Sequence, residues 1–259
     1  MTRTIVVPLD GSEYATRALP IAGWLADRLG AGLNLIMTTF DADTSADTAY
    51  LDEQAATMKR DDVQVDLRRN VFAARAIVDA VDARPEAALC MTTRGRGRVA
   101  QVLLGSVCDE VVREATAPVV LVGPACTPSA VSEAEIVVCL DNSHGSTTLL
   151  PVVAEWADRL GLVVHLLAVD PAGIADDPGN GASAELLEES ARIIEDQGVH
   201  CETHLLRSSH PADAITAFAA ARDAALIALG SGGHSGGSAL GRVTNHVVHN
   251  SPCPVLVRR

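Results

Sequence analysis

Lysine, aromatic residues and long apolar runs are all scarce in this chain of 259 residues. Lys59 is the only lysine, which excludes a P-loop, because that motif places a lysine beside the phosphates. Aromatic residues make up only 3% of the sequence, so any core must consist of valine, isoleucine, leucine and alanine. No stretch approaches the roughly 18 uncharged apolar residues of a membrane span, and Asp10 interrupts the first apolar run. We therefore expect a cytoplasmic protein without membrane insertion.

Clustered basic residues, paired cysteines and a catalytic constellation are lacking too. The net charge of −13 argues against a nucleic-acid partner, because neutralising phosphates requires clustered lysine and arginine. The six cysteines include no C-x-x-C pair, so we expect reduced, structural thiols. No acidic residue follows Ser235, which excludes the serine, acid, histidine order of a hydrolase around that serine. No general base with an orienting partner stands out, so we expect no enzyme beyond slow, incidental ATP hydrolysis.

What the chain does contain is an internal duplication. The segment Ile5–Ser12 returns as Ile136–Ser143, and Ala26–Gly30 returns as Ala157–Gly161. Repetition at this distance indicates tandem domains of about 130 residues, each long enough for its own core. The sequence predicts a first domain over 1–123, a turn-rich linker over 124–133 and a second domain over 134–259.

Short β-branched runs alternate with amphipathic stretches in both copies, which predicts parallel strands joined by crossover helices. In the first copy we expect strands near 3–9, 33–39, 63–69, 87–93 and 118–122, and helices near 13–29, 46–60, 72–83 and 105–115. In the second copy we expect strands near 135–140, 162–169, 199–206, 225–230 and 254–258, and helices near 144–160, 183–197, 211–222 and 241–250. The fold class is therefore α/β, with two tandem doubly wound (Rossmann-like) domains, each a five-stranded parallel sheet flanked by helices. A ligand crevice is expected at the carboxyl ends of the strands.

Three features of the first copy converge on that crevice. Asp10 ends the first strand, where a carboxylate can accept from a ribose hydroxyl or an adenine amino group. The stretch Thr92–Arg98 follows the fourth strand, and its glycines allow backbone amides to approach an anion closely. Gly105-Ser106 then opens a helix whose N-terminus favours negative charge. The alternative is a solvated loop in which Ser106 merely caps the helix.

These residues carry a resemblance to a known family. Val6–Ser12, the loop Met91-x-x-Arg94-Gly95 with nine residues before Gly105-Ser106, and the terminal Ala117–Val122 resemble the universal stress protein family (UspA-like), in a tandem arrangement that covers essentially the whole chain. Its ATP-binding members carry G-x-x-G, nine residues, then G-[S/T]. One departure is that Thr92 replaces the leading glycine. The resemblance implies that Pro8, Leu9, Asp10 and Thr38 bind adenine and ribose, and that Gly95, Gly105, Ser106 and Val107 hold the phosphates. Further cofactor-binding positions are Met91, Thr92 and Arg94.

The second copy departs from the pattern differently. Gly230 and Gly233 supply both leading glycines, but only seven residues separate Gly233 from Gly241, and Arg242 replaces the serine. A shorter loop cannot enclose phosphates in the same way, although Arg242 could pair with an anion. The resemblance keeps Asp141 and Val169 at the base end. A smaller nucleotide, weak binding and a purely structural role all stay open for this copy.

The resemblance also implies function and assembly. The expected ligand is ATP, with AMP or cAMP as alternatives and Mg²⁺ as a companion of ATP. Bound nucleotide would bias contacts with a protein partner of unknown identity during stress. A ligand-free interaction scaffold and a slow ATP hydrolase are the alternatives. The terminal strands of the two domains are expected to pair within the chain across a pseudo-two-fold, with a homodimer of the whole chain as a further option.

One alternation in the second copy suggests metal ligands. His200, Glu202 and His204 fall on one face of an expected strand. The first copy has Gln64, Asp66 and Arg68 at the positions that sequence alignment matches to them, which favours a solvated polar face. The sequence therefore predicts no metal site.

Overall fold

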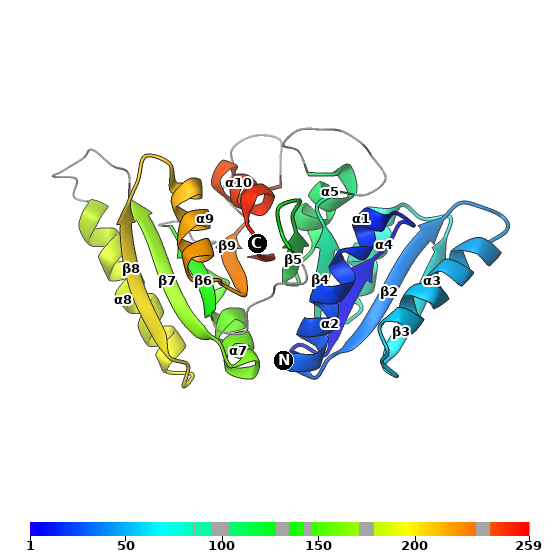
Figure 1. Ribbon diagram of the computed structural model, residues 1–259, viewed down its shortest axis with the longest axis horizontal. Helices are drawn as coiled ribbons and strands as arrows, with labels where there is room; N and C mark the ends of the chain where they lie inside the picture. The colour runs from blue at the N-terminus through cyan, green and yellow to red at the C-terminus, as the bar shows by residue number, and fades with distance from the viewer. Residues whose placement is uncertain are drawn as a thin grey trace. The chain divides into compact units, whose positions relative to one another are not determined.

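A computed structural model of the chain describes residues 1–84, 86–94, 104–127, 135–141, 147–170, 179–231 and 239–258, without the side chains of 179–182. Contacts divide the chain into two units, Met1–Val122 and Gly123–Arg259, here called the first and second units (Figure 1). Residues 128–134 lie outside the described part, so the linker stays a prediction.

The first unit contains one parallel sheet. Its strands run in the order β3-β2-β1-β4-β5, with bounds β1 Thr4–Pro8, β2 Gly32–Thr39, β3 Val63–Arg69, β4 Ala87–Thr92 and β5 Val119–Val122. The strand order reverses between β1 and β4. Strand β1 pairs with β2 on one side and with β4 on the other, and each pairing begins at the first residues of the two strands. Open α/β sheets bind ligands at this switch point.

Helices flank the sheet of the first unit. They are α1 Glu13–Thr16, α2 Ala18–Leu29, α3 Ser45–Thr57, α4 Ala73–Asp82 and α5 Ser106–Glu114, with α4 beside α5. The expected helix over 13–29 is broken at Arg17, which separates α1 from α2. Ser12 caps the start, as expected, and Gly30 ends α2 in the left-handed conformation at φ 58°.

The second unit repeats the plan. Its sheet has the order β10-β9-β6-β7-β8, with bounds β6 Glu135–Leu140, β7 Val163–Asp170, β8 Cys201–Arg207, β9 Leu226–Gly230 and β10 Val255–Arg258. Its helices are α7 Leu150–Leu160, α8 Gly179–Glu195, α9 Pro211–Ala221 and α10 Arg242–Asn250. The expected helix over 144–160 is interrupted, because Thr147 is helical, Thr148 and Leu149 form a turn, and α7 begins at Leu150. Its expected start at 144 lies among residues 142–146, outside the described part.

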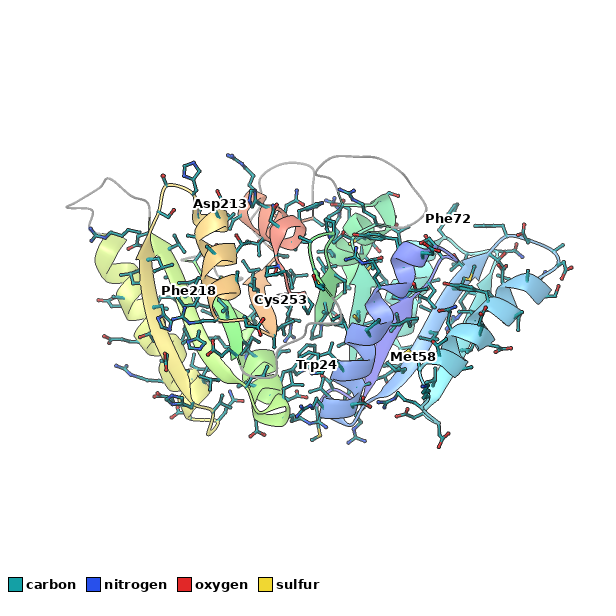
Figure 2. All side chains as sticks on the ribbon, viewed as in Figure 1. Trp24, Met58, Phe72, Asp213, Phe218 and Cys253 are labelled. Atoms are coloured by element: carbon teal, nitrogen blue, oxygen red, sulfur yellow. The ribbon has the colours of Figure 1, made fainter. Side chains whose placement is uncertain are left out.

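The cores consist of aliphatic residues, as the composition requires. Strands β4 and β5 are buried along their whole length. All six cysteines are free and buried, which confirms the expected structural thiols. Burial raises the pKa of Cys108 to about 12 and that of Cys253 (Figure 2) to about 11, so both remain protonated near neutral pH. Within the described residues, no helix is long and apolar enough to cross a membrane.

The fold class is confirmed: each unit is a doubly wound domain with five parallel strands. The expected strand bounds agree with the structure to within two residues. Helix bounds are less accurate, and α8 begins four residues before its expected start at 183. Such differences arise because helix ends depend on local capping, which hydrophobic periodicity does not encode.

Candidate functional site

Asp10 lies just beyond β1, at the switch point of the first unit. Its Oδ1 accepts hydrogen bonds from the backbone N of Ser12 at 3.0 Å and from Ser12 Oγ at 2.6 Å. Ser12 Oγ in turn accepts from the backbone N of Ala15 at 3.2 Å. The turn requires a positive φ of 80° at Gly11, which a glycine adopts without strain. Asp10 therefore fixes the turn into α1, a structural role that the sequence did not reveal.

The residues expected at the base end lie along the same sheet edge. Leu9 is buried, and its N–H donates to the carbonyl of Ile36 at 2.8 Å. Pro8 pairs with Ile36 in the register of β1 and β2, so Thr38 lies two residues further along at the carboxyl end. Pro8 and Thr38 are both half-buried. The structure therefore places Pro8, Leu9, Asp10 and Thr38 around one edge.

The loop after β4 begins with ordered contacts. Met91 and Thr92 end β4 and are both 5% exposed. Thr92 Oγ1 donates to the carbonyl of Arg94 at 2.7 Å. The residue that replaces the leading glycine therefore stabilises the turn at the start of the loop. The loop closes where the N–H of Gly105 donates to the carbonyl of Thr93 at 2.8 Å. Gly95 and the rest of 95–103 lie outside the described residues.

Gly105 is the N-cap of α5, and no side chain caps this helix. The alternative in which Ser106 acts as the cap is therefore wrong, because Ser106 is already the first helical residue. Ser106 is exposed and Val107 half-buried. A Cβ on Gly105 would lie 3.3 Å from the carbonyl oxygen of Thr93 and 3.5 Å from the Cα of Arg94, so backbone packs tightly there. The helix N-terminus presents amide donors without a side-chain partner, an arrangement suited to an anion.

Among the described residues, two polar atoms at the start of this loop are buried without a hydrogen-bond partner, namely Thr93 Oγ1 and Arg94 Nε. A buried donor that stays unpaired costs about 1 to 3 kcal/mol, and more when it is charged. Such atoms call for an explanation, and a bound ligand supplies one. Thr93 was missed by the sequence reasoning, which used Thr92 and Arg94 on either side of it.

The matching region of the second unit keeps the backbone framework. The N–H of Gly241 donates to the carbonyl of Ser231 at 2.8 Å, as Gly105 does to Thr93. The connection is two residues shorter, and Arg242 begins α10 as an exposed side chain. Thr244 Oγ1 donates to the carbonyl of Gly230 at 3.0 Å, within the same turn.

The base end of the second unit differs from that of the first. Asp141 is exposed, whereas Asp10 is half-buried, and Val169 is half-buried like Thr38. The next residue, Asp170, is buried and accepts a hydrogen bond from Ser183 Oγ at 2.7 Å. Gly233 lies outside the described residues. Among its described residues, the second unit thus keeps the backbone hydrogen bond that closes the connection, but its acidic residue Asp141 is exposed.

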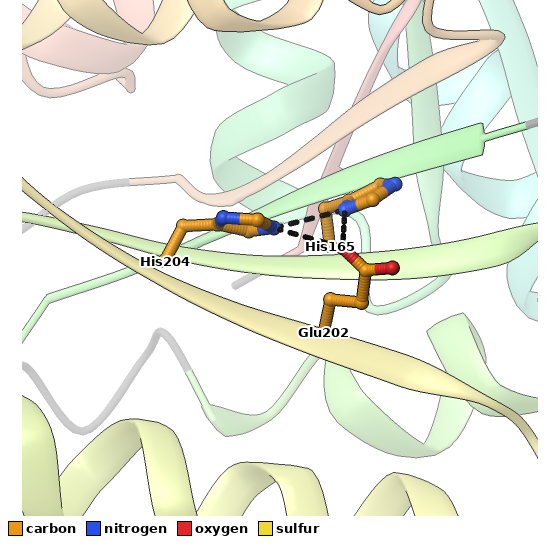
Figure 3. A group of neighbouring side chains, drawn as sticks. All are labelled: His165, Glu202 and His204. Atoms are coloured by element: carbon orange, nitrogen blue, oxygen red, sulfur yellow. Dashed lines mark hydrogen bonds and ion pairs between the residues drawn. The ribbon is translucent and has the colours of Figure 1, made fainter.

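A separate polar cluster forms near the amino ends of β7 and β8 (Figure 3). His165 Nδ1 lies 3.0 Å from His204 Nε2, and Glu202 Oε2 lies 3.6 Å from each of these nitrogens. Burial, followed by the charge of Arg222, lowers the pKa of His204. The sequence grouped Glu202 and His204 with His200 but missed His165, which lies on another strand.

The structure also corrects the sequence alignment of the two copies at this place. His200 lies before β8 and is exposed outside the cluster. The register pairs His165 with Glu202 and Asn34 with Gln64, so the first unit's counterparts of Glu202 and His204 are Gln64 and Asp66. The correspondence of His200 with Gln64 is therefore wrong by two residues, because the connection before β8 is longer.

Comparison with known proteins places this fold in a family. The family model described as "Universal stress protein family" matches residues 1–123 and 134–259. A universal stress protein of Mycobacterium tuberculosis is 31% identical over 191 residues, and the match spans 68% of this chain but only 60% of that relative. The solved universal stress protein of Archaeoglobus fulgidus DSM 4304 has a TM-score of 0.70 and 21% identity, and the match covers 99% of this chain and 98% of that one. A smaller A. fulgidus universal stress protein, solved in complex with dAMP, is 28% identical, with a TM-score of 0.42 and coverage of 49% of this chain and 98% of its own. This chain belongs to the universal stress protein family, as the match of the family model to both halves establishes.

Proposed function

We propose that the first unit binds an adenine nucleotide at the carboxyl edge of β1, β2 and β4. ATP is the expected ligand, with AMP or cAMP as alternatives. The observation that carries the proposal is the pair of buried, unpartnered atoms, Thr93 Oγ1 and Arg94 Nε, beside the uncapped N-terminus of α5. Together they provide a hydroxyl, a cationic N–H and backbone amides, which is a donor set suited to phosphate oxygens.

The site residues take their roles from this arrangement. Arg94, Gly95, Gly105, Ser106 and Val107 would hold the phosphates, and Mg²⁺ would accompany the phosphates of ATP. Pro8, Leu9, Asp10, Thr38 and Met91 would surround adenine and ribose. Thr92 orders the loop through its bond to the carbonyl of Arg94 and leaves the anion contacts to the neighbouring residues.

For the second unit we propose weak nucleotide binding or none. Its connection is shorter, and an exposed Arg242 stands where the first unit has Ser106. Asp141, Val169, Gly230, Gly233, Gly241 and Arg242 remain the candidate residues of this second site. A long exposed arginine can pair with an anion, but it loses side-chain entropy when it does so.

We further propose that bound nucleotide biases contacts between the protein and a partner in the stress response. Membership of the universal stress protein family supports this role. A ligand can shift such contacts only through a difference in affinity between two states of the loop. A ligand-free scaffold of the same fold is the competing hypothesis.

The test is mass spectrometry of small molecules released from gently purified full-length chain, followed by calorimetric titration with ATP, AMP and cAMP. We expect an adenine nucleotide in the released fraction and one tight site per chain. No released nucleotide together with no heat of binding would favour the scaffold and refute the proposal.

A further inference from the structure

The cluster of His165, Glu202 and His204 lies away from the candidate nucleotide edge. His165 is the third residue of β7 and Glu202 the second of β8, so both lie toward the amino ends of these strands. The candidate residues Asp141 and Val169 lie at or beyond the carboxyl ends of β6 and β7. The cluster therefore calls for its own explanation. We propose that His165, Glu202 and His204 bind a divalent transition metal ion of the Zn²⁺ class.

The donor set and its spacing carry this proposal. Two imidazole nitrogens and one carboxylate oxygen are a ligand set that Zn²⁺ commonly takes. At bond lengths near 2.1 Å, tetrahedral geometry separates neighbouring ligand atoms by about 3.4 Å. The three separations here are 3.0, 3.6 and 3.6 Å. Glu202 is too far from either nitrogen for a hydrogen bond, but all three atoms are within reach of one ion.

The surroundings of His165 fit the same role. Its Nε2 lies 3.2 Å from Glu135 Oε2, and both atoms are buried without a well-aligned hydrogen bond. Metal-bound histidines usually place a carboxylate behind the ring in this way, because it fixes the tautomer and strengthens the ligand. An ion on Nδ1 would hold the proton of His165 on Nε2, facing Glu135. The buried Oε2 of Glu135 would then accept the hydrogen bond from the metal-bound His165 ring.

Charge and packing also favour a cation. Arg222 lies 3.9 Å from Glu135 Oε2 and stacks on Phe218 of α9 (Figure 2), with its guanidinium carbon 3.7 Å from the ring centroid. With neutral imidazoles, Glu135, Glu202 and Arg222 leave the cluster at −1. The His204 ring meets Phe218 at 4.9 Å between centroids, which restricts its orientation. Glu202 is 52% exposed, so an ion and a water ligand can reach the site from solvent.

The first unit shows what the same place looks like without this chemistry. Asn34, Gln64 and Asp66 occupy the three equivalent positions. Arg68 supplies a fixed cation there, donating from Nε and Nη2 to the two oxygens of Asp66 at 2.6 and 2.8 Å. In the second unit the residue equivalent to Arg68 is Leu206, so no guanidinium from that position balances the carboxylate. The second unit thus exchanges a protein cation for the donor set of a metal.

The experiment uses the full-length chain, stripped with a chelator and titrated with ZnCl₂ by calorimetry. We expect one tight Zn²⁺ site, and His204→Ala should weaken it by more than the roughly 10- to 100-fold that loss of an outer partner costs. Glu135→Gln should weaken it by about tenfold for the same reason. His200→Ala is the matched control, since this neighbouring exposed histidine lies outside the cluster. Its affinity should equal that of the unmodified chain.

A second measurement keeps the test independent of folding in the variants. CoCl₂ added to the unmodified chain should give the strong visible absorption of tetrahedral Co²⁺, and ZnCl₂ should abolish it. His165→Asn introduces the residue that the first unit carries at this position, so the fold should survive, which circular dichroism checks, and the band should disappear. Zn²⁺ affinity unchanged in His204→Ala, or Co²⁺ absorption no stronger than that of the free ion, would overturn the proposal.

Discussion

The connections that follow β4 and β9 share one backbone hydrogen bond but differ in length and in the placement of an arginine. In both units a glycine N–H donates at 2.8 Å to a carbonyl just beyond the strand, which starts the last helix in the same place. The first unit spans this gap with two more residues and buries an arginine N–H without a partner. The second unit uses the shorter connection and exposes its arginine at the helix start. The backbone framework is therefore common to both units, whereas the unpaired donors occur in the first unit, where we propose that a ligand uses them.

The polar clusters on the sheets differ in the opposite direction, because here the second unit carries the candidate ligand-binding groups. The first unit pairs Asp66 with Arg68 and buries Asn34 Oδ1 without a hydrogen-bond partner among the described residues, whereas the second unit gathers His165, Glu202 and His204. After a duplication, each copy can specialise a different part of one scaffold. Four substitutions test how far that division holds.

The largest effect is expected at Gly105. Gly105→Val adds a branched side chain where a single Cβ would already lie 3.3 Å from the carbonyl oxygen of Thr93, and it also covers the start of α5. ATP affinity should fall by at least about 100-fold, or about 2.8 kcal/mol. Gly241→Val is the matched control in the second unit and should change affinity by less than about twofold. Equal losses from the two variants, measured by calorimetry, would mean that the two sites are equivalent.

Arg94 should come next. Arg94→Ala removes a charged donor worth about 1.5 to 3 kcal/mol to a ligand, so ATP affinity should fall by roughly 10- to 100-fold. Without ligand the variant should be as stable as the parent, or more stable, because a buried unpaired N–H has been removed. Thermal melting with and without ATP separates the two effects. Arg242→Ala is the control, and a loss of affinity there as large as at Arg94 would refute the assignment.

Asp10→Asn should have an intermediate effect. Asparagine retains an oxygen that can accept from Ser12, so the turn into α1 is kept while the negative charge is lost. We expect ATP affinity to fall by about tenfold, or about 1.4 kcal/mol. Asp141→Asn should leave it unchanged. Ser12→Ala tests the turn alone, and if it reduces affinity as much as Asp10→Asn, the role of Asp10 is structural.

The smallest effect is expected at Arg68. Arg68→Leu introduces the residue that the second unit carries at the same register position. The ion pair with Asp66 is partly exposed, at 42% for the arginine side chain, so solvent screens most of its energy. The free energy of unfolding should change by less than about 1 kcal/mol, as urea denaturation would measure. A loss of several kcal/mol would mean that Asp66 needs its cation, and the two clusters would then differ in stability as well as in chemistry.

The strands and their doubly wound, parallel arrangement follow from the sequence, because alternating apolar runs and a duplicated pattern specify such a domain. The carboxyl-edge position of the candidate site stays a prediction. The free cysteines follow in the same way. The break at Arg17 does not, since both flanking segments continue one helical pattern. Nor does the bond from Asp10 to Ser12, because a single carboxylate can serve a ligand and a turn alike.

The histidine cluster shows a different limit. His165 meets His204 only because β7 and β8 pair in one register, and that register depends on a connection whose length differs between the two copies. Glu202 and His204 alternate on one strand and are visible in the sequence as a pair. Their third member comes from a neighbouring strand, which no local pattern predicts. The unpaired Arg94 Nε is hidden for the same reason, since burial is a property of the folded loop.

Strand β7 contributes residues to both the proposed metal site and the candidate nucleotide site of the second unit. It carries His165 near its beginning and Val169 near its end, four residues apart, which is about 13 Å along an extended strand. The proposed metal site and the candidate nucleotide site of the second unit thus share strand β7, at positions too far apart for an ion and a nucleotide to collide. A metal ion bound as proposed at His165 would therefore leave the candidate nucleotide residue Val169 accessible, and a nucleotide at Val169 would not displace the ion.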